Sequence, residues 1–399
     1  MTATTCPICR KSGLVSTVKR SRLPAMQNYV FRHIELAQMA KSGRFDLAAC
    51  PACGFAHNTS FDPALVDYDE GYDNSVPSSV MTTYYKELAT YLHEKYSLDN
   101  RLIVDVGCGK GTFLKVMCEM FTRVRGLGID PSYEGDSQID DGRIEFVKDF
   151  FSERHIGERP SLVVCRHVVE HIPHPMSFLK TIHSALEAFP ETQLYFEVPD
   201  TNWIIENSAF WDFCYEHCNY FTPNSLSNVL ELSGFTPHTI RTAFGNQYVC
   251  VETGNPKDKS LSRSDKDDTA SLSFVNKLTR YSGNELALMS GIHQRFSGLK
   301  REGWSIAVWG MATKGVVFSL LVDTDRTLID FCIDMNPNKQ GCFVPLTGHS
   351  IEAPEMLRKV NSKPLAVVVM NPNYSYEIRN TCKALSIEPV FMDATGNKV

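Results

Sequence analysis

A histidine preceded by a glutamate, Glu216-His217, stands in a run of residues that is otherwise rich in aromatic side chains. An imidazole titrates near neutral pH, so His217 has the chemistry of a general base, and the neighbouring carboxylate could orient or stabilise its charged ring. A histidine in a protein core is, however, more often held by the backbone than catalytic. His167, His171 and His174 are further candidates, so the pattern alone leaves the identity of the base open.

Two C-x-x-C pairs, Cys6 with Cys9 and Cys50 with Cys53, lie near the start of the chain. Each pair places two thiolates on one tight turn, and two pairs complete the tetrahedral coordination that zinc prefers. Because protein ligands fill all four positions, we expect a structural zinc ion. Four unrelated buried cysteines and a redox pair, which usually occurs singly, are the weaker alternatives. A DNA-binding zinc finger is disfavoured because the segment has no basic recognition helix.

A third group of residues is a glycine-rich turn in which Gly107, Gly109 and Gly111 alternate shortly after Asp105. Glycine lets the backbone turn sharply and lets a ligand approach closely. The N-terminus of a helix that follows favours negative charge. Asp130 comes about 20 positions later, where a ribose diol can be held. The alternating glycines differ from the G-x-G-x-x-G pattern of dinucleotide enzymes, although the turn by itself does not exclude them.

The elements that must position these groups are short apolar strands that alternate with helices. Asp149-Phe150 follows one such strand and suits the edge and face of an adenine ring. Ligands of parallel sheets bind outside the carboxyl ends of the strands, and the polar residues noted above occur there. The strands that we expect in this part of the chain are 102–105, 124–129, 144–147, 162–165 and 193–198.

The order of strand, glycine loop, acidic strand end, Asp-Phe pair and H-x-x-E-H segment resembles class I S-adenosylmethionine (SAM) methyltransferases. The resemblance implies a Rossmann-like fold and SAM as the cofactor. The residues that it implies for SAM binding are Asp105, Gly107, Gly109, Gly111, Asp130, Asp149, Phe150 and His167.

A polar stretch rich in Gly, Pro and Ser at 254–271 has the composition of a linker, and an amphipathic helix is predicted at 273–302. Strands expected beyond it, at 305–309, 328–333, 364–370 and 390–392, predict a second, smaller parallel α/β unit. Glycine, lysine and asparagine at its strand ends could hold a diphosphate or a base. It could instead be a degenerate fold that only shapes a cleft. The candidate substrate-binding residues are Lys314, Asn336, Lys339 and Asn373.

The whole layout resembles the three-domain sugar C-methyltransferases that act on nucleotide-linked keto-deoxysugars. Those proteins have two C-x-x-C pairs, a SAM domain with an E-H-x-x-Y-F segment, and a C-terminal nucleotide-fold domain; here the segment reads E-H-C-N-Y-F. The resemblance implies His217 as the catalytic base, with Glu216 beside it and the zinc segment forming part of the substrate cleft. Relatives commonly have a tyrosine where this chain has Cys214, so Tyr72 or Tyr215 is expected to replace it.

We therefore expect an α/β protein with a zinc-binding domain at 1–66, a SAM methyltransferase domain at 67–254 and a C-terminal nucleotide-fold domain at 255–399. The predicted activity is C-methylation of a nucleotide-linked keto-deoxysugar held between the last two domains. An O- or N-methyltransferase on the same scaffold and a non-enzymatic zinc and SAM-binding module are the alternatives. The sugar, the nucleotide, the methylated atom and the oligomeric state remain open.

Composition excludes several other classes of protein. The net charge of −6 provides no positive field for nucleic acid or an anionic membrane. No apolar run reaches the roughly 18–20 residues of a membrane-spanning helix, and we see no core of a signal peptide. An odd count of 13 cysteines, scattered through the chain, favours reduced thiols. We therefore expect a cytoplasmic protein.

Overall fold

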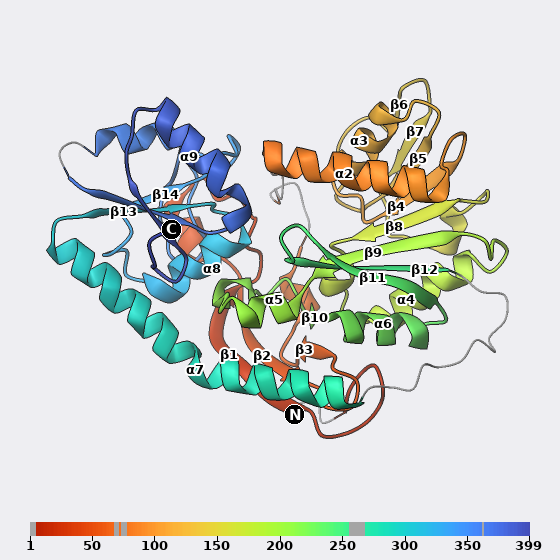
Figure 1. Cartoon of the computed structure of the whole chain (residues 1–399), viewed down its shortest axis with the longest axis horizontal. Coiled ribbons are helices and arrows are strands. Elements are labelled where there is room, and N and C mark those ends of the chain that lie inside the picture. The colour runs from red at the N-terminus through yellow and green to blue at the C-terminus, as the bar shows by residue number, and fades with distance from the viewer. Residues whose placement is uncertain (1–4, 68–71, 73–77, 255–267, 361–362) are drawn as a thin grey trace.

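The computed structural model describes residues 5–67, 72, 78–254, 268–360 and 363–399, so most of the predicted linker lies outside the described residues. The described chain contains three sheets (Figure 1). This arrangement confirms the predicted α/β class, with a Rossmann-like central sheet and a second Rossmann-like sheet after it. No helix in the described ranges is long and apolar enough to cross a membrane. The domain limits at 66/67 and 254/255 stay predictions.

The N-terminal sheet is antiparallel and includes one strand from the middle of the chain. Asn219 and Tyr220 of that strand pair with His57 and Ala56. The stretch around His217 is therefore attached to the N-terminal sheet. In spatial order the strands are β1 (Val15–Pro24), β2 (Ser42–Ala49), β3 (Ala56–Asn58) and β10 (Asn219–Tyr220), with helix α1 (Ile34–Gln38) between β1 and β2 in sequence.

The central sheet has eight strands, five of which run parallel. Every residue of β4 is buried, including Asp105, and the apolar run 102–104 is typical of a strand covered on both faces. In spatial order the strands are β11 (Thr236–Ala243), β12 (Tyr248–Gly254), β9 (Gln193–Pro199), β8 (Leu162–Arg166), β4 (Leu102–Val106), β5 (Arg125–Ile129), β7 (Ile144–Val147) and β6 (Gln138–Ile139). Its helices are α2 (Ser79–Tyr96), α3 (Thr112–Met120), α4 (Pro175–Ala185), α5 (Thr201–Glu206) and α6 (Pro223–Leu232).

The C-terminal sheet consists of five parallel strands, as the alternating pattern predicts. In spatial order they are β15 (Ile351–Glu352), β14 (Phe331–Ile333), β13 (Ser305–Trp309), β16 (Leu365–Val369) and β17 (Val390–Asp393), with helices α8 (Thr313–Val322) and α9 (Ser375–Ala384). Short 3₁₀ turns connect the elements of the chain: η1 (Pro63–Leu65), η2 (Glu153–His155), η3 (Val169–His171), η4 (Phe210–Asp212), η5 (Pro354–Lys359) and η6 (Pro372–Tyr374).

A single long helix, α7 (Asp268–Arg301), runs along the N-terminal sheet and leads into the C-terminal one (Figure 1). Glu285 on α7 forms a buried ion pair with Arg20 of β1 and accepts a hydrogen bond from Tyr281 (2.9 Å). A buried pair of this kind is costly to break from one side. It therefore anchors α7 to the N-terminal sheet.

Candidate active site

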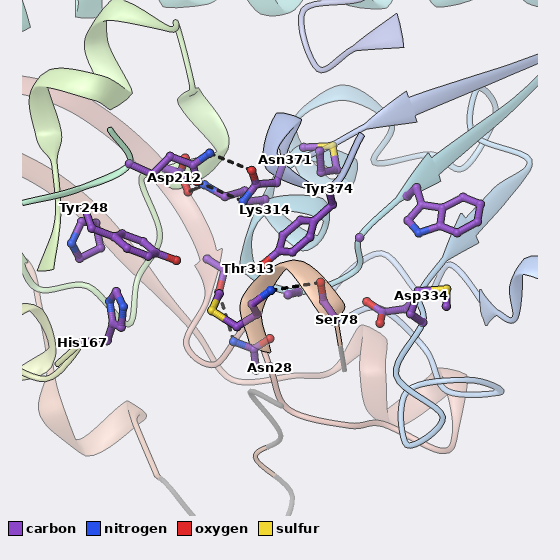
Figure 2. A pocket seen from close by; sticks show the side chains of 18 of the residues that line it. Asn28, Ser78, His167, Asp212, Tyr248, Thr313, Lys314, Asp334, Asn371 and Tyr374 are labelled. Atoms are coloured by element: carbon purple, nitrogen blue, oxygen red, sulfur yellow. Dashed lines mark hydrogen bonds and ion pairs between the residues drawn. The ribbon is translucent and has the colours of Figure 1, made fainter. Parts of the chain in front are cut away.

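A cavity of about 360 Å³ lies between the three sheets. The N-terminal part contributes Asn28, the central sheet contributes His167 and Tyr248, and the C-terminal sheet contributes Lys314 and Asp334. Figure 2 shows His167 and Tyr248 on one side of this cavity and Asp334 on the other. The glycine turn after β4 lies outside the cavity lining.

The three glycines of the turn after β4 are needed for different reasons. All have positive φ angles, 75° at Gly107, 56° at Gly109 and 76° at Gly111, a region that residues with a Cβ rarely adopt. A Cβ at Gly107 would collide with Val168, and one at Gly111 would collide with Phe146, so packing also requires these two glycines. A Cβ at Gly109 would meet no described atom within 4 Å. Gly109 is therefore the glycine of this turn with open space beside its Cα.

Two carboxylates lie beside this turn. Asp130 directly follows β5 and accepts hydrogen bonds from the N–H groups of Gly109 (2.8 Å) and Ser132 (2.7 Å). These bonds hold it at the edge of the sheet where ribose hydroxyls bind in folds of this type. Asp105 is only 4% exposed, and burial raises the pKa of its carboxyl to about 7, although the charge of Arg166 opposes this shift.

Asp149 and Phe150 follow β7 at the same edge of the sheet. One oxygen of Asp149 accepts the N–H of Phe150 (2.8 Å), and the other pairs with Arg154, which holds the pKa of the carboxyl below its usual range. The Phe150 ring is 76% exposed, so one face is accessible to a planar ligand. The sites predicted for SAM thus lie along one edge of the sheet, and their roles stay predictions.

His167 directly follows β8, and its ring lies between two buried carboxylates. Its Nε2 is 3.0 Å from Glu197 Oε1, and its Nδ1 is 3.5 Å from Glu170 Oε1. Burial disfavours the charged ring, but the hydrogen bonds to the two carboxylates outweigh this effect and raise the pKa of His167 to about 9. The imidazole therefore carries a positive charge at neutral pH, and it contacts Tyr248 at the cavity wall.

Glu197, in β9, is a buried carboxylate that binds several of the side chains around His167. Arg166 donates two hydrogen bonds to its Oε1 (3.1 and 2.8 Å), and the hydroxyls of Tyr195 (2.6 Å) and Tyr84 donate to its Oε2. Burial acts to raise the pKa of Glu197, but the charge of Arg166 holds it well below its usual range. Glu197 is therefore an ionised group with no exposed surface.

The imidazole of His217 also lines the cavity, with its ring 4.8 Å from that of His171 and nearly perpendicular to it. In the described part of the chain, no side-chain hydrogen bond to the His217 ring is found. Burial lowers its pKa well below 6.5, and the charges of His171, His167 and Lys314 act in the same direction. The ring is therefore neutral at neutral pH and can accept a proton.

Residues 214–219, which contain the predicted base His217 and are called the base segment below, bond to the turn that follows β8. The Asn219 amide donates to two carbonyls of this turn, at 2.9 and 2.7 Å. In the other direction, Nδ1 of His171 donates to the carbonyl of Glu216 (3.1 Å). These three bonds fix the position of His217 relative to the central sheet.

Glu216 connects the base segment to the N-terminal part of the chain. Its carboxylate is 2% exposed and accepts hydrogen bonds from the N–H of Gln27 and from the hydroxyl of Tyr72. Burial raises the pKa of this carboxyl. The Tyr72 hydroxyl also bonds the Asn28 side chain, and both of these residues line the cavity. The N-terminal part thus supports the base segment and contributes to the cavity wall.

Tyr215 and Tyr72, the two predicted phenols, have different surroundings. Tyr215 is fully buried, its hydroxyl accepts the N–H of Asp62 (2.8 Å), and its ring fills the space over Gly43. It is not part of the cavity lining. The ring of Tyr215 is part of the N-terminal core, whereas Tyr72 lines the cavity, and the catalytic role of either phenol stays a prediction.

Two of the predicted substrate-binding residues line the cavity, and both already have partners. Lys314 Nζ lies 2.5 Å from the carboxylate of Asp212, and Lys339 Nζ donates to Asn28 Oδ1 (2.9 Å). Lys314 belongs to α8, whereas Asp212 belongs to the central part of the chain. These lysines therefore also join the C-terminal sheet to the other two.

The other two predicted residues, Asn336 and Asn373, are not among the residues that line this cavity, and their role in substrate binding stays a prediction. The side-chain oxygen of Asn336 accepts the N–H of Asn338 (3.0 Å) and so stabilises its own turn. The Asn373 amide donates to the carbonyl of Phe244 (2.8 Å), a contact between the central and C-terminal parts. Polar residues at strand ends can stabilise a turn, bond a neighbouring segment or bind a ligand. Their spacing in the sequence does not distinguish these three roles.

The four N-terminal cysteines come together as the two C-x-x-C pairs predict. The Sγ atoms of Cys6 and Cys53 are 3.7 Å apart, those of Cys9 and Cys50 are 3.6 Å apart, and all four lie within 4.8 Å of one another. None is in a disulfide. A tetrahedron with Zn–S bonds of about 2.3 Å separates its sulfurs by roughly 3.8 Å. The spacing therefore fits a structural zinc ion.

Other residues of the cavity wall could not be found from motifs. Asn28, Tyr85 and Trp203 line the cavity, but no recognisable pattern surrounds them in the sequence. Gln247 and Tyr248 also line it, and the Gly-Asn-Gln-Tyr turn that contains them is the only local signal. These residues come from distant parts of the chain, so only folding brings them together.

Comparisons with known proteins identify two domains. Residues 78–240 match a methyltransferase domain, and residues 249–388 match the C-methyltransferase C-terminal domain. The chain is 24% identical over 294 residues to the C-methyltransferase NovU of Streptomyces niveus, covering 70% of this chain and 68% of that protein. It is 24% identical over 140 residues to a ubiquinone biosynthesis O-methyltransferase of Xanthomonas campestris, covering 33% of this chain and 57% of that relative.

Among solved structures, the chain resembles magnesium protoporphyrin IX methyltransferase from Synechocystis with bound SAH, with a TM-score of 0.35 and 14% identity, over 46% of this chain and 89% of that one. The two domain matches and the similarity to NovU support one reading of the chain. It combines a methyltransferase domain with the C-methyltransferase C-terminal domain that follows it, and a SAM-dependent methyltransferase is the class that this combination supports.

Proposed function

We propose that this enzyme transfers a methyl group from SAM to a carbon next to the carbonyl of a nucleotide-linked keto-deoxysugar, with His217 as the general base. The observation that carries the proposal is a neutral imidazole at the wall of a cavity between the central and C-terminal sheets. The C-methyltransferase C-terminal domain and the similarity to NovU support carbon as the acceptor.

The chemistry explains why a base is needed. A hydrogen on carbon becomes acidic when an adjacent carbonyl can take up the resulting charge as an enolate. His217 accepts this proton, and the electron pair of the C–H bond moves into the enolate. Bound SAM supplies a methyl group that is electrophilic because it is carried on a sulfonium.

Cations at the cavity wall support both the removal of the proton by His217 and the formation of the enolate. His167, which is charged at neutral pH, and Lys314 favour negative charge that develops on the substrate. The same two charges help to keep His217 unprotonated. The same positive charges therefore keep His217 in its neutral form and lower the energy of the enolate.

The remaining residues hold the reactants and the base in place. Gly109, Asp130 and Asp105 are the residues that would hold SAM, and the four cysteines would hold zinc. Glu216 and Tyr72 are positioning residues, because they connect the base segment to the N-terminal part of the chain. Correct placement of the reacting groups can supply much of the rate acceleration.

The proposal is tested by hydrogen exchange without methyl transfer. The enzyme is incubated in D₂O with SAH, the demethylated form of SAM, and a panel of keto-sugar nucleotides, and the sugar C–H signals are followed by NMR. We expect the wild type to exchange the hydrogen next to the carbonyl and His217→Ala to lose this exchange. An enzyme that methylates the sugar without any such exchange would be an O- or N-methyltransferase.

Steady-state kinetics give a second test. His217→Ala should lower methyl transfer by roughly 10²- to 10⁴-fold, the usual contribution of a general base. Its affinity for SAM should stay unchanged, because the cofactor edge of the sheet is untouched. Tyr215→Phe is the matched control, since its ring lies outside the cavity, and it should keep most of the activity. Full activity of His217→Ala would exclude His217 as the base.

A further inference from the structure

Glu170 is a buried carboxylate at the wall of the main cavity. It lies in η3, the turn that follows β8, and is only 1% exposed. His167 Nδ1 is 3.5 Å from its Oε1, but neither oxygen of Glu170 accepts a hydrogen bond of normal geometry from the described residues. Buried polar groups nearly always have such partners, and a bound ion is one explanation for a group without them. The Glu170 carboxylate therefore has acceptor positions for a ligand in the cavity.

Two histidine rings lie next to this carboxylate. A carboxylate oxygen of Glu170 and one ring nitrogen each of His171 and His217 all lie within 4.8 Å of one another. The two rings are nearly perpendicular, and their centroids are 4.8 Å apart. His217 reaches this position because the bonds of Asn219 hold the base segment against η3. The fold thus brings together three side chains that can bind one metal ion.

The hydrogen bonding and the spacing of these side chains suit metal ligands. A histidine that binds a metal usually donates its other ring N–H to a carbonyl or a carboxylate, which fixes the direction of the ring. Nδ1 of His171 donates to the carbonyl of Glu216 (3.1 Å) in this way. Around a tetrahedral ion with bonds of about 2.1 Å, ligand atoms are roughly 3.4 Å apart. Since the three atoms here lie within 4.8 Å, small side-chain rotations would bring them to that spacing.

The ligand atoms select the kind of ion. Imidazole nitrogens suit divalent transition metals such as Zn²⁺ and Ni²⁺, whereas Mg²⁺ and Ca²⁺ prefer oxygen ligands. Two nitrogens and one oxygen therefore favour a transition metal. Three protein ligands leave a fourth coordination position, which water from the cavity can fill. The ring of His167 competes for the Glu170 carboxylate, so we expect weaker binding here than at the four cysteines.

We infer that Glu170, His171 and His217 form a binding site for a divalent transition-metal ion in the main cavity, separate from the four-cysteine cluster. The ion would be bound by the ring lone pair of His217, the same pair that accepts the proton of the substrate. A bound ion should therefore inhibit methyl transfer. The site itself stands on the geometry, whereas the inhibition rests on the proposed function, because it takes His217 as the base.

A titration with Co²⁺ tests the site without methyl transfer. The full chain is first given one equivalent of Zn²⁺ for the four cysteines, and Co²⁺ is then added and followed by absorption spectroscopy. We expect one additional Co²⁺ per chain, without the thiolate charge-transfer bands that cobalt bound to cysteine would give. The NMR spectrum of the wild type should show hyperfine-shifted signals from two histidine rings, a result that needs no substitution. Mg²⁺ in excess should not displace the Co²⁺.

Matched variants identify the ligands. Glu170→Gln keeps the shape of the side chain but removes its charge, and it should weaken Co²⁺ binding by at least roughly 10-fold. Loss of an outer-shell partner alone typically costs 10- to 100-fold in metal affinity, and loss of a ligand should cost no less. His174→Asn removes an exposed histidine that lies outside the cluster, and it should leave Co²⁺ binding unchanged.

The outcomes separate the site from the proposed function. Failure to bind an additional Co²⁺, or equal affinity in the wild type and Glu170→Gln, would overturn the inference. At concentrations that fill the site, Co²⁺ should inhibit methyl transfer by the wild type, and excess Mg²⁺ should not. Bound Co²⁺ without inhibition would support the site and would refute His217 as the base.

Discussion

Replacing Glu197 by glutamine would leave a buried cation without its counter-charge. The Glu197 side chain has no exposed surface, and that of Arg166 is 7% exposed. Glutamine keeps the shape and one oxygen for Arg166 and His167, but it loses the charge and the second acceptor, to which the hydroxyls of Tyr195 and Tyr84 donate. Removing one partner of a buried ion pair costs about 3–5 kcal/mol. For a unit of 150–250 residues, this corresponds to a decrease in Tm of roughly 6–20 °C.

The assay is thermal unfolding at pH 7, followed by circular dichroism, with Glu252→Gln as the control. Glu252 is also fully buried on this sheet, but its cations, Lys95 and Arg241, are 31% and 30% exposed and can be solvated when the charge is lost. We therefore expect a smaller decrease in Tm for Glu252→Gln. A Tm for Glu197→Gln equal to that of the control, or within about 2 °C of the wild type, would refute the reasoning.

The same substitution has a second, independent consequence at the cavity. Glu197 is one of the two carboxylates that raise the pKa of His167 to about 9. In Glu197→Gln the pKa of His167 should therefore decrease, which NMR titration of the ring would show. An unchanged pKa would mean that Glu170 alone keeps the ring charged.

Further predictions concern pH, charge and metal. Because the base acts in its neutral form and its pKa is well below 6.5, kcat/KM should reach its plateau below pH 6.5 and should decrease above about pH 9 as His167 loses its charge. The folded-state pKa of His167 is raised, so its contribution to stability should be complete below pH 6.5 and lost as the pH rises through 9, measurable by urea unfolding. Lys314→Gln should lower kcat/KM and move the acid limb to higher pH, because Lys314 lowers the pKa of His217. Cys50→Ser should reduce the zinc content measured by atomic absorption and lower the Tm of the N-terminal part, whereas Cys382→Ser, far from this cluster in the sequence, should keep the zinc.

The features that were predictable from sequence are local. The glycine turn between β4 and α3 and the two C-x-x-C pairs each lie within a few residues, so their geometry follows from the chain itself. The alternation of apolar strands and helices likewise predicted the parallel strands of the central sheet and the parallel C-terminal sheet. The reasons for the glycines were only partly predictable, because Val168 and Phe146 pack against two of them from elsewhere in the chain.

The composition of the cavity was decided by the tertiary structure. Residue types and spacing favoured Tyr215, Asn336 and Asn373 as site residues. In the structure, Tyr215 packs in the N-terminal core, Asn336 stabilises its own turn, and Asn373 bonds the central part of the chain. The pairing of β10 with β3 and the bonds of Asn219 set His217 opposite His171. Sequence therefore determined which chemical groups and local turns this protein has. The packing of distant segments decided which of those groups share one cavity. A side chain reaches the cavity only when its backbone directs it there and the neighbouring segments leave space for it.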